Sequence, residues 1–326
     1  RDTLRSRGLG DVYKRQRLYF VTLPESTLED ARGEAKLLMS SLESEWGLTD
    51  LRIETSELVK LQVALATGDR GITVAVFEST QIIGVWSGLF DAPRGVAVDV
   101  GSTTVAAHLC DLATGDVLSS ASVMNPQIPF GEDLMSRVSY IMMHPEGAEA
   151  MSSAIQTALS KLFAELTDQL GEPTDNILEV SLVANPIMHH LVLGINPINL
   201  GGAPFALTIN EAVTLKARDL GLDTHNQARL FVLPCIAGHV GADTAGVILA
   251  ESPDSDNAMS LIVDVGTNAE IVLGNKDRLL VCSSPTGPAF EGGEISAGQR
   301  ATAGAIERVR IDRETLEPKF RVIGSE

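Results

Sequence analysis

The pattern of apolar and polar positions divides the chain into regions with different expected structures. Residues 17–92 carry short strand patterns and helical patterns close together, which predicts a small α+β domain. Its expected elements, in chain order, are a strand at 18–23, helices at 28–45 and 56–66, and strands at 72–77 and 81–86.

From residue 93 onwards the pattern changes to longer strands, glycine-containing turns and helices. Three consecutive antiparallel strands are expected at 96–99, 105–109 and 117–123. A long amphipathic helix follows, with apolar residues three or four positions apart: Met151, Ile155, Leu159, Leu162, Leu166 and Leu170. An alternating series then completes an α/β lobe over 93–250, with strands at 177–184 and 230–233 and helices at 186–193 and 240–250.

The strand triplet then starts again, at 261–265, 270–273 and 279–283. A repeated triplet predicts an internally duplicated α/β fold with a cleft between its halves. Residues 251–326 are therefore expected to begin a second lobe that is truncated, since the chain stops shortly after a strand-like segment at 319–323. The Arg-rich residues 1–16 lack this patterning, and we interpret them as a non-native leader.

Both strand triplets begin with the same short motif. An apolar strand ends in Asp99-Val-Gly101-Ser102-Thr103-Thr104 in the first and in Asp264-Val-Gly266-Thr267-Asn268 in the second. Glycine lets the backbone approach a ligand closely, and the hydroxyl and amide groups of the turn suit phosphate. A single turn of this kind is equally explained by hairpin sterics. The pair favours two hairpins that hold one polyphosphate from both sides.

Carboxylates at these hairpins point to a cation. Asp99 and Asp264 end their apolar strands, and a buried charge is costly unless it faces a counter-ion, so we expect them to hold Mg²⁺ through water. Glu270 and Glu291 add negative charge near the expected triphosphate, and Gly287 belongs to the glycine-containing segment before Glu291.

Asp243, in Gly241-Ala-Asp243-Thr244, opens a predicted helix between the two hairpins. It could serve at the cleft, or it could cap the helix by accepting hydrogen bonds from free backbone amides.

Composition narrows the class of partner. The chain has 326 residues, 44% of them hydrophobic, and a formal net charge of −18, which argues against nucleic acid or an anionic membrane as partner. The three cysteines, Cys110, Cys235 and Cys282, have no metal-site spacing and are expected to be buried small hydrophobes. Because there is neither a secretion leader nor an apolar stretch of about 18 residues, we expect a cytoplasmic protein.

Two further segments leave alternatives open. The adjacent His189 and His190 point in different directions on a helix, so we expect one core and one surface histidine rather than a ligand pair. The polar segment from Asn125 to Gln127, held extended by Pro126 and Pro129, suits either a loop that faces the cleft or a partner, or an ordinary linker.

Several motifs together resemble a known family. The paired hairpins are similar to those of the acetate and sugar kinase, Hsp70 and actin superfamily, the ASKHA ATPases. Further segments resemble reductive activators of corrinoid-dependent proteins: Asn125–Asp133, Met188–Gly194, Gly241–Thr244 and Gly287–Gly292. This resemblance implies a duplicated ribonuclease-H-like (actin-like ATPase) core, with residues 18–90 as the domain that precedes it.

The resemblance also implies cofactors and partners. They are ATP, Mg²⁺ and a corrinoid (cobalamin) protein or corrinoid-dependent methyltransferase, with a homodimer left open. Family members carry a 2Fe-2S domain with a cysteine cluster, which is absent from this chain. The nucleotide-binding core is also expected to be cut short, so that the adenine-contacting glycine-rich turn downstream of the second hairpin is missing.

Three hypotheses about function follow. The first is an ATPase that couples nucleotide-driven closure to reactivation of a corrinoid protein, with Asp99, Asp243 and Asp264 as its catalytic residues and Asp243 orienting water or the metal. The second is a small-molecule kinase with Asp243 as general base. The third is a non-catalytic nucleotide-sensing module. Neither hairpin contains Arg or Lys, so we expect slow basal turnover that a partner or a monovalent cation raises.

Overall fold

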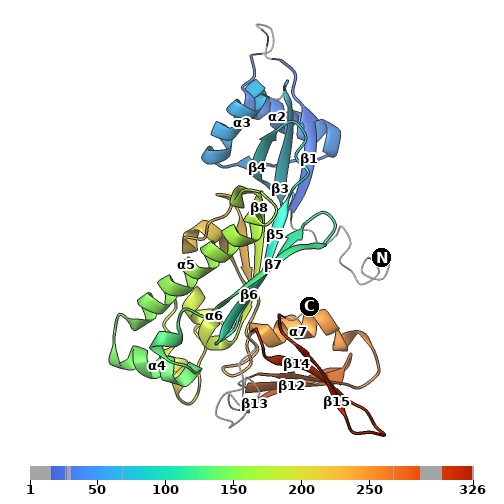
Figure 1. The fold of residues 1–326 in the computed structure, drawn as a ribbon. Helices are drawn as coiled ribbons and strands as arrows, with labels where there is room; N and C mark the ends of the chain where they lie inside the picture. Colours follow the sequence, from blue (N-terminus) through green and yellow to red (C-terminus); the bar gives the residue numbers. More distant parts are fainter. Residues whose placement is uncertain are drawn as a thin grey trace.

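The computed structural model describes residues 16–25, 27, 31–67, 69–266, 268–286 and 303–324. Along the chain follow a small N-terminal domain, a domain built on a six-stranded sheet, and a C-terminal group of strands (Figure 1). Of the helices in this described part, none is long and apolar enough to cross a membrane.

The N-terminal domain is a four-stranded sheet with the order β1-β3-β4-β2. Helices α2 (Glu34–Trp46) and α3 (Thr55–Thr67) pack on one face, where Leu38, Leu42 and Leu61 meet Ile72 and Ile82. The strands are β1 (Gln16–Thr22), β2 (Arg52–Ile53), β3 (Gly71–Phe77) and β4 (Gln81–Ser87). The expected α+β pattern is present, although the two-residue strand β2 is too short to show an alternation.

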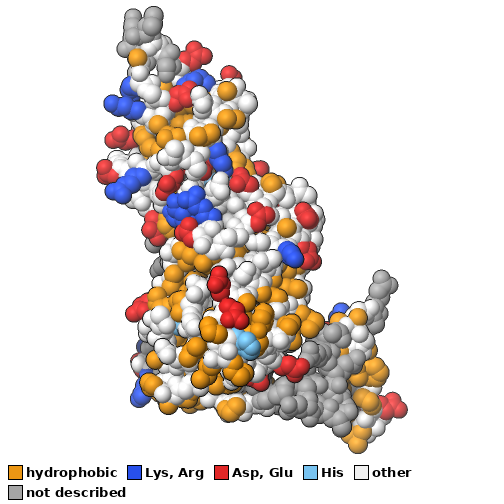
Figure 2. Space-filling view, turned by 90° about the vertical axis from the view of Figure 1, so that its left-hand side faces the viewer, with side chains coloured by type: hydrophobic (Ala, Val, Ile, Leu, Met, Phe, Trp, Pro, Cys, Tyr) orange, Lys and Arg blue, Asp and Glu red, His pale blue; other side chains and the backbone are white. Residues whose placement is uncertain are grey.

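The other face of this small sheet packs on the next domain. Side chains alternate along a strand, so Ala75, Phe77 and Ile83 point away from α2 and α3 and contact Leu178. Polar contacts cross the same boundary: Lys216 Nζ lies 3.1 Å from Glu54 Oε1, and Gln227 Nε2 donates to Ser56 Oγ over 2.9 Å. Figure 2 shows basic side chains gathered at this level and hydrophobic side chains spread over the face below it.

The central sheet has the order β7-β6-β5-β8-β10-β9. Strands β5, β6 and β7 form an antiparallel meander, while β8 pairs parallel to β5 and β10 parallel to β8. Their bounds are β5 Arg94–Val100, β6 Thr104–Asp111, β7 Val117–Met124, β8 Ile177–Ala184, β9 Val213–Lys216 and β10 Arg229–Val232. The carboxyl ends of the parallel strands therefore meet at one edge, beside the turn after β5.

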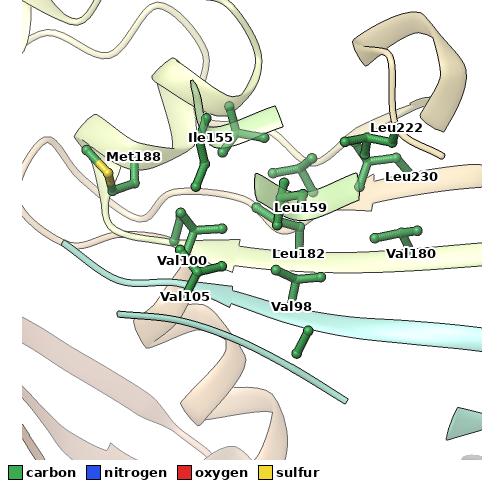
Figure 3. Close-up of a cluster of buried hydrophobic side chains, with 14 of the residues drawn as sticks. Val98, Val100, Val105, Ile155, Leu159, Val180, Leu182, Met188, Leu222 and Leu230 are labelled. Carbon is green, nitrogen blue, oxygen red and sulfur yellow. The ribbon is translucent and has the colours of Figure 1, made fainter. Parts of the chain in front are cut away.

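Helices cover both faces of the central sheet. On one face α5 (Gly147–Asp168) and α6 (Pro186–Val192) enclose the main core, in which Val98, Leu182 and Leu230 meet Ile155 and Leu159 (Figure 3). Helix α4 (Leu134–Met143), missed in the sequence, leads into α5. On the opposite face α7 (Ala242–Glu251) packs over β8. Short 3-10 helices lie at Ile128–Phe130, Thr174–Asn176, Ile198–Gly201, Ala217–Leu220 and Pro253–Ser255.

The C-terminal strands repeat the antiparallel meander. Strands β11 (Ser260–Val265), β12 (Asn268–Asn275) and β13 (Arg278–Pro285) form one sheet, and β14 (Ile306–Ile311) and β15 (Pro318–Val322) form another. The expectation that the strand before Asp264 is buried is wrong for these residues, since Leu261 is 65% and Val265 49% exposed. The apolar run marks a strand correctly, but within the described chain no layer covers it on both faces.

Candidate functional site

The first hairpin turn is tight and open to solvent on one side. Gly101 N–H donates to Thr104 O over 3.0 Å, which closes the turn between β5 and β6. A Cβ on Gly101 would lie 2.7 Å from that same carbonyl oxygen, so only glycine fits here. Ser102 and Thr103 are partly exposed and Thr104 is exposed. The turn therefore presents its hydroxyl-bearing residues at the surface, as the phosphate-binding expectation requires.

The second hairpin turn is also closed by its glycine N–H, but the paired strand ends, Val265 and Ala269, lie one residue closer in sequence than Val100 and Val105. Gly266 N–H donates to Asn268 O over 2.8 Å, and Thr286 Oγ1 donates to Gly266 O over 2.6 Å. Thr267, Gly287 and Glu291, all expected at the site, lie outside the described residues.

Asp243 lies in the first turn of α7, where the helix starts against the end of β8. The helix N-cap is Gly241, and a Cβ there would lie 2.6 Å from Ala184 O and 2.7 Å from Asp243 Oδ1. Asp243 Oδ1 accepts a hydrogen bond from Thr244 N–H over 2.7 Å. Asp243 thus satisfies one helix amide without being the capping residue, and the close approach at Gly241 places its carboxylate beside the sheet edge.

The carboxylates of the two hairpins and of α7 act on one another. The pKa of Asp99 is raised from 3.8 to about 6, first by partial removal from water and then by the charges of Asp243 and Asp264. Asp99 is nevertheless accessible to solvent. Val98 and Val100 face the α5 side, so the alternation of β5 turns Asp99 towards α7.

Two neighbouring carboxylates behave in the same way. Burial raises the pKa of Asp243, and the charge of Asp264 raises it further, while the hydrogen bond from Thr244 lowers it. Burial also raises the pKa of Glu270, as do the charges of Asp243 and Asp264, against the hydrogen bond that Ser283 Oγ donates over 3.0 Å. The charges of Asp243 and Asp264 therefore act on both Asp99 and Glu270, which brings together four sequence-predicted acids from three separate segments.

This acidic group fits a divalent cation held through water. Within the described ranges, no three His, Cys, Asp or Glu side chains converge as direct metal ligands would. Mg²⁺ commonly keeps several waters and binds phosphate oxygens together with one or two carboxylates. Burial is the largest cause of these raised pKa values, and the mutual repulsion that adds to it is what a cation and its bound water would relieve.

A buried polar network behind the first turn was missed in the sequence. Asn125, Gln127 and Arg137 are each 1% exposed or less. Asn125 Nδ2 donates to Gly101 O over 2.7 Å, and Arg137 Nη2 donates to Ser102 O. The 125–127 segment is a loop, as expected, but its Asn125 and Gln127 side chains point into the interior rather than towards a cleft or a partner. The available signal was Arg137, which shares the apolar helical face of Leu134, Val138 and Ile141.

The remaining candidate groups are structural. Both His189 and His190 are buried, so the expected surface histidine is wrong. His190 Nε2 accepts from Thr208 N–H over 3.0 Å, and its Nδ1 lies 2.9 Å from Pro186 O, which it reaches as a donor. Burial lowers the pKa of both rings. Of the cysteines only Cys235 is buried; Cys110 is half-buried and Cys282 is exposed, against expectation.

A pocket on another surface has a different character. It lies between β7 and α5, has a volume of about 540 Å³, and is lined by residues such as Val123, Met124, Ala154 and Lys161. None of the sequence-predicted site residues lines it. This pocket is therefore separate from the group of carboxylates at the edge of the sheet.

Comparisons with known proteins agree with this architecture. Residues 11–92 match the RACo linker region, residues 94–255 the RACo middle region, and residues 258–326 the C-terminal domain of RACo, the ASKHA domain. The solved structure of a reductive activator for corrinoid, iron-sulfur protein matches with a TM-score of 0.82 and 30% identity, over 95% of this chain and 50% of that one.

Two curated proteins are also similar. The corrinoid activation enzyme RamQ of Eubacterium limosum is 37% identical over 71% of this chain and 38% of its own length. The Co(II) methylated amine-specific corrinoid protein reductase of Methanosarcina barkeri is 26% identical over 65% of this chain and 40% of its own length. The chain thus spans about two fifths of these relatives. The expected actin-like ASKHA fold is confirmed, and the chain belongs to the RACo family.

Proposed function

We propose that this chain is the nucleotide-binding part of an ATP-dependent activator that drives reductive reactivation of a corrinoid protein. One observation supports the nucleotide site most directly. Asp99 and Asp264 belong to two different hairpins, yet they lie close enough for the charge of Asp264 to raise the pKa of Asp99. The fold is of the ASKHA class, which implies nucleotide use, and the similar proteins are named as activators or reductases of corrinoid proteins.

In this proposal the polyphosphate lies between the turns at 101–104 and 266–268 and accepts hydrogen bonds from their amides and hydroxyls. Asp99 and Asp264 hold the waters of Mg²⁺, which neutralises charge on the polyphosphate. Asp243 orients the attacking water and accepts its proton, a role that its raised pKa favours. Glu270 keeps Ser283 in place beside the second turn.

Closure of the cleft would couple the nucleotide to the partner. A polyphosphate that contacts both hairpins binds the closed arrangement better than the open one, and only such a difference in affinity shifts the equilibrium. The domain division at 17–92, 93–250 and 251–326 gives the moving parts. Electrons would come from a 2Fe-2S domain on a separate segment, since the cysteines here have no cluster spacing.

The test is hydrolysis of Mg²⁺·ATP by the chain, with and without a corrinoid protein. We expect slow phosphate release that the corrinoid protein stimulates, together with a complex of the two proteins. Phosphate transferred to an added sugar or carboxylate instead of water would favour the kinase. ATP binding without hydrolysis under either condition would favour the non-catalytic module. Membership of the RACo family favours the activator over both.

A further inference from the structure

Arg137 is a fully buried arginine whose contacts are all to neutral groups. Its Nε donates to Gly131 O over 2.9 Å, its Nη1 contacts Gln127 Oε1 at 3.4 Å and Met188 Sδ at 3.3 Å, and its Nη2 donates to Ser102 O. Among the described residues it forms no ion pair. Asp133, whose charge acts on it, instead accepts from Ser136 N–H at the start of α4.

Arg94, at the opposite end of β5, shows how this fold otherwise stabilises a buried guanidinium. Its Nη1 lies 2.7 Å from Asp111 Oδ2 and its Nη2 2.7 Å from Glu172 Oε1. Its pKa is raised, whereas burial lowers the pKa of Arg137 to about 10. A buried charge without a partner of opposite sign is strongly unfavourable. Apart from the charge of Asp133, which forms no ion pair with it, nothing within the described part of the chain balances the positive charge of Arg137, which is still present at neutral pH.

The network around Arg137 holds three successive carbonyls of the first turn. Asn125 Nδ2 donates to Gly101 O, Arg137 Nη2 to Ser102 O, and Asn125 N–H to Thr103 O over 2.8 Å. A trans peptide is planar, so a carbonyl drawn towards the interior turns the N–H of the same peptide outwards. The carbonyl of Gly101 thus directs the N–H of Ser102 away from the network and towards the open side of the turn.

We propose that Arg137 is a positioning residue for the polyphosphate: it fixes the carbonyls of the first turn from behind and supplies a positive charge that the bound polyphosphate balances. The inference rests on the proposed nucleotide site and deepens it. This role accounts for the lack of Arg and Lys in both hairpin turns, because the cation that acts on the first turn lies on α4, outside the turn itself. Because the side chain of Arg137 is itself removed from water, its charge acts on an anion at the turn partly through the protein interior, where the interaction is stronger than in water.

The experiment compares Arg137→Lys and Arg137→Met with Arg94→Lys as the matched control, using calorimetric titration of ATP with Mg²⁺ and thermal unfolding of each protein. Arg137→Met removes the charge, and we expect ATP affinity to fall by about 10- to 100-fold. Arg137→Lys keeps a group that can carry a positive charge, but burial at the same position lowers the pKa of the lysine ammonium far below its ordinary value. ATP affinity of this variant should then fall as the pH rises from 7 to 9, while that of the unmodified chain stays level.

The Arg94→Lys control separates the effect of lost fold stability from the effect of lost charge near the first turn. Arg94→Lys should unfold at a lower temperature, since it loses the bidentate pair with Glu172, but bind ATP with unchanged affinity at every pH. If Arg137→Met does not fold, the pH profile of Arg137→Lys decides. If Arg137→Lys binds ATP with unchanged affinity at every pH, the role of Arg137 is overturned, while the nucleotide site itself is not. Failure of the unmodified chain to bind ATP would overturn the nucleotide site and this inference together.

Discussion

The two Asp-Val-Gly hairpins share a motif but differ in how they are supported. The first is braced from behind by Asn125 and Arg137, and its strand β5 lies in the middle of a six-stranded sheet with Val98 3% exposed. The second ends β11, the outer strand of a three-stranded sheet, with Val263 49% exposed, and its turn is held by Thr286. The same Val-Asp-Val-Gly sequence therefore lies in a well-buried strand end in one hairpin and in a weakly buried one in the other.

This difference suggests separate tasks. A turn whose carbonyls are already held needs little reordering when it binds an anion, whereas a turn on an outer strand can move with the ligand. We infer that the first hairpin is the fixed half of the clamp and the second the half that closes. The following experiments test this difference between the two hairpins.

The largest effect is expected from the two strand-end aspartates. Asp99→Asn should lower Mg²⁺-dependent ATP hydrolysis by roughly 10²- to 10³-fold, because Asp99 lies on the fixed half and faces both other charges. Asp264→Asn should cost only about tenfold. Steady-state phosphate release measures both, with the exposed Asp116→Asn as control. Equal losses at the two hairpins would remove the distinction between a fixed and a closing half.

A stability contrast comes next, at the valines immediately before each aspartate. Val98→Ala removes two buried methyl groups and leaves a gap, so the free energy of unfolding should fall by about 2 kcal/mol. Val263→Ala, at a half-exposed position, should change it by less than about 0.5 kcal/mol. Denaturant titration with the same probe for both variants gives the comparison. A Val263→Ala loss as large as that of Val98→Ala would show that β11 is as well buried as β5.

The smallest effect is a shift in pH dependence. Asp99 has a pKa of about 6 instead of 3.8, so the folded chain holds its proton where the unfolded chain does not. The free energy of unfolding should therefore fall as the pH rises from about 4 to about 6, while Mg²⁺·ATP affinity rises through pH 6.

Asp264→Asn removes one of the charges that raise the pKa of Asp99, so the midpoint should move down by about half a pH unit. Calorimetric titration between pH 5 and 7 measures the midpoint. The same titration on Asp99→Asn is the control, and it should show no midpoint between pH 5 and 7. An unmoved midpoint in Asp264→Asn would mean that the two hairpins do not face each other in solution.

Much of the fold could be read from local patterns. The amphipathic spacing from Met151 to Leu166 predicted α5, and the apolar runs predicted β5 to β8 and β10 to within two residues at each end. These elements have strong periodicity because one face is buried. Strands β9 and β14 and helix α4 were missed, since a four-residue strand, an exposed strand and a helix carrying a buried Arg all blur the alternation.

By itself the sequence determined the two Asp-Val-Gly turns, the duplicated strand order and the absence of Arg and Lys from both turns. Local sterics dictate such features, because glycine at a close approach and alternation along a strand act over a few residues. Only the tertiary structure decided that Asp99, Asp243, Asp264 and Glu270 interact and that Arg137 reaches Ser102, 35 residues away in the chain. Those contacts depend on packing α4 and α7 against a completed sheet, which no short segment specifies.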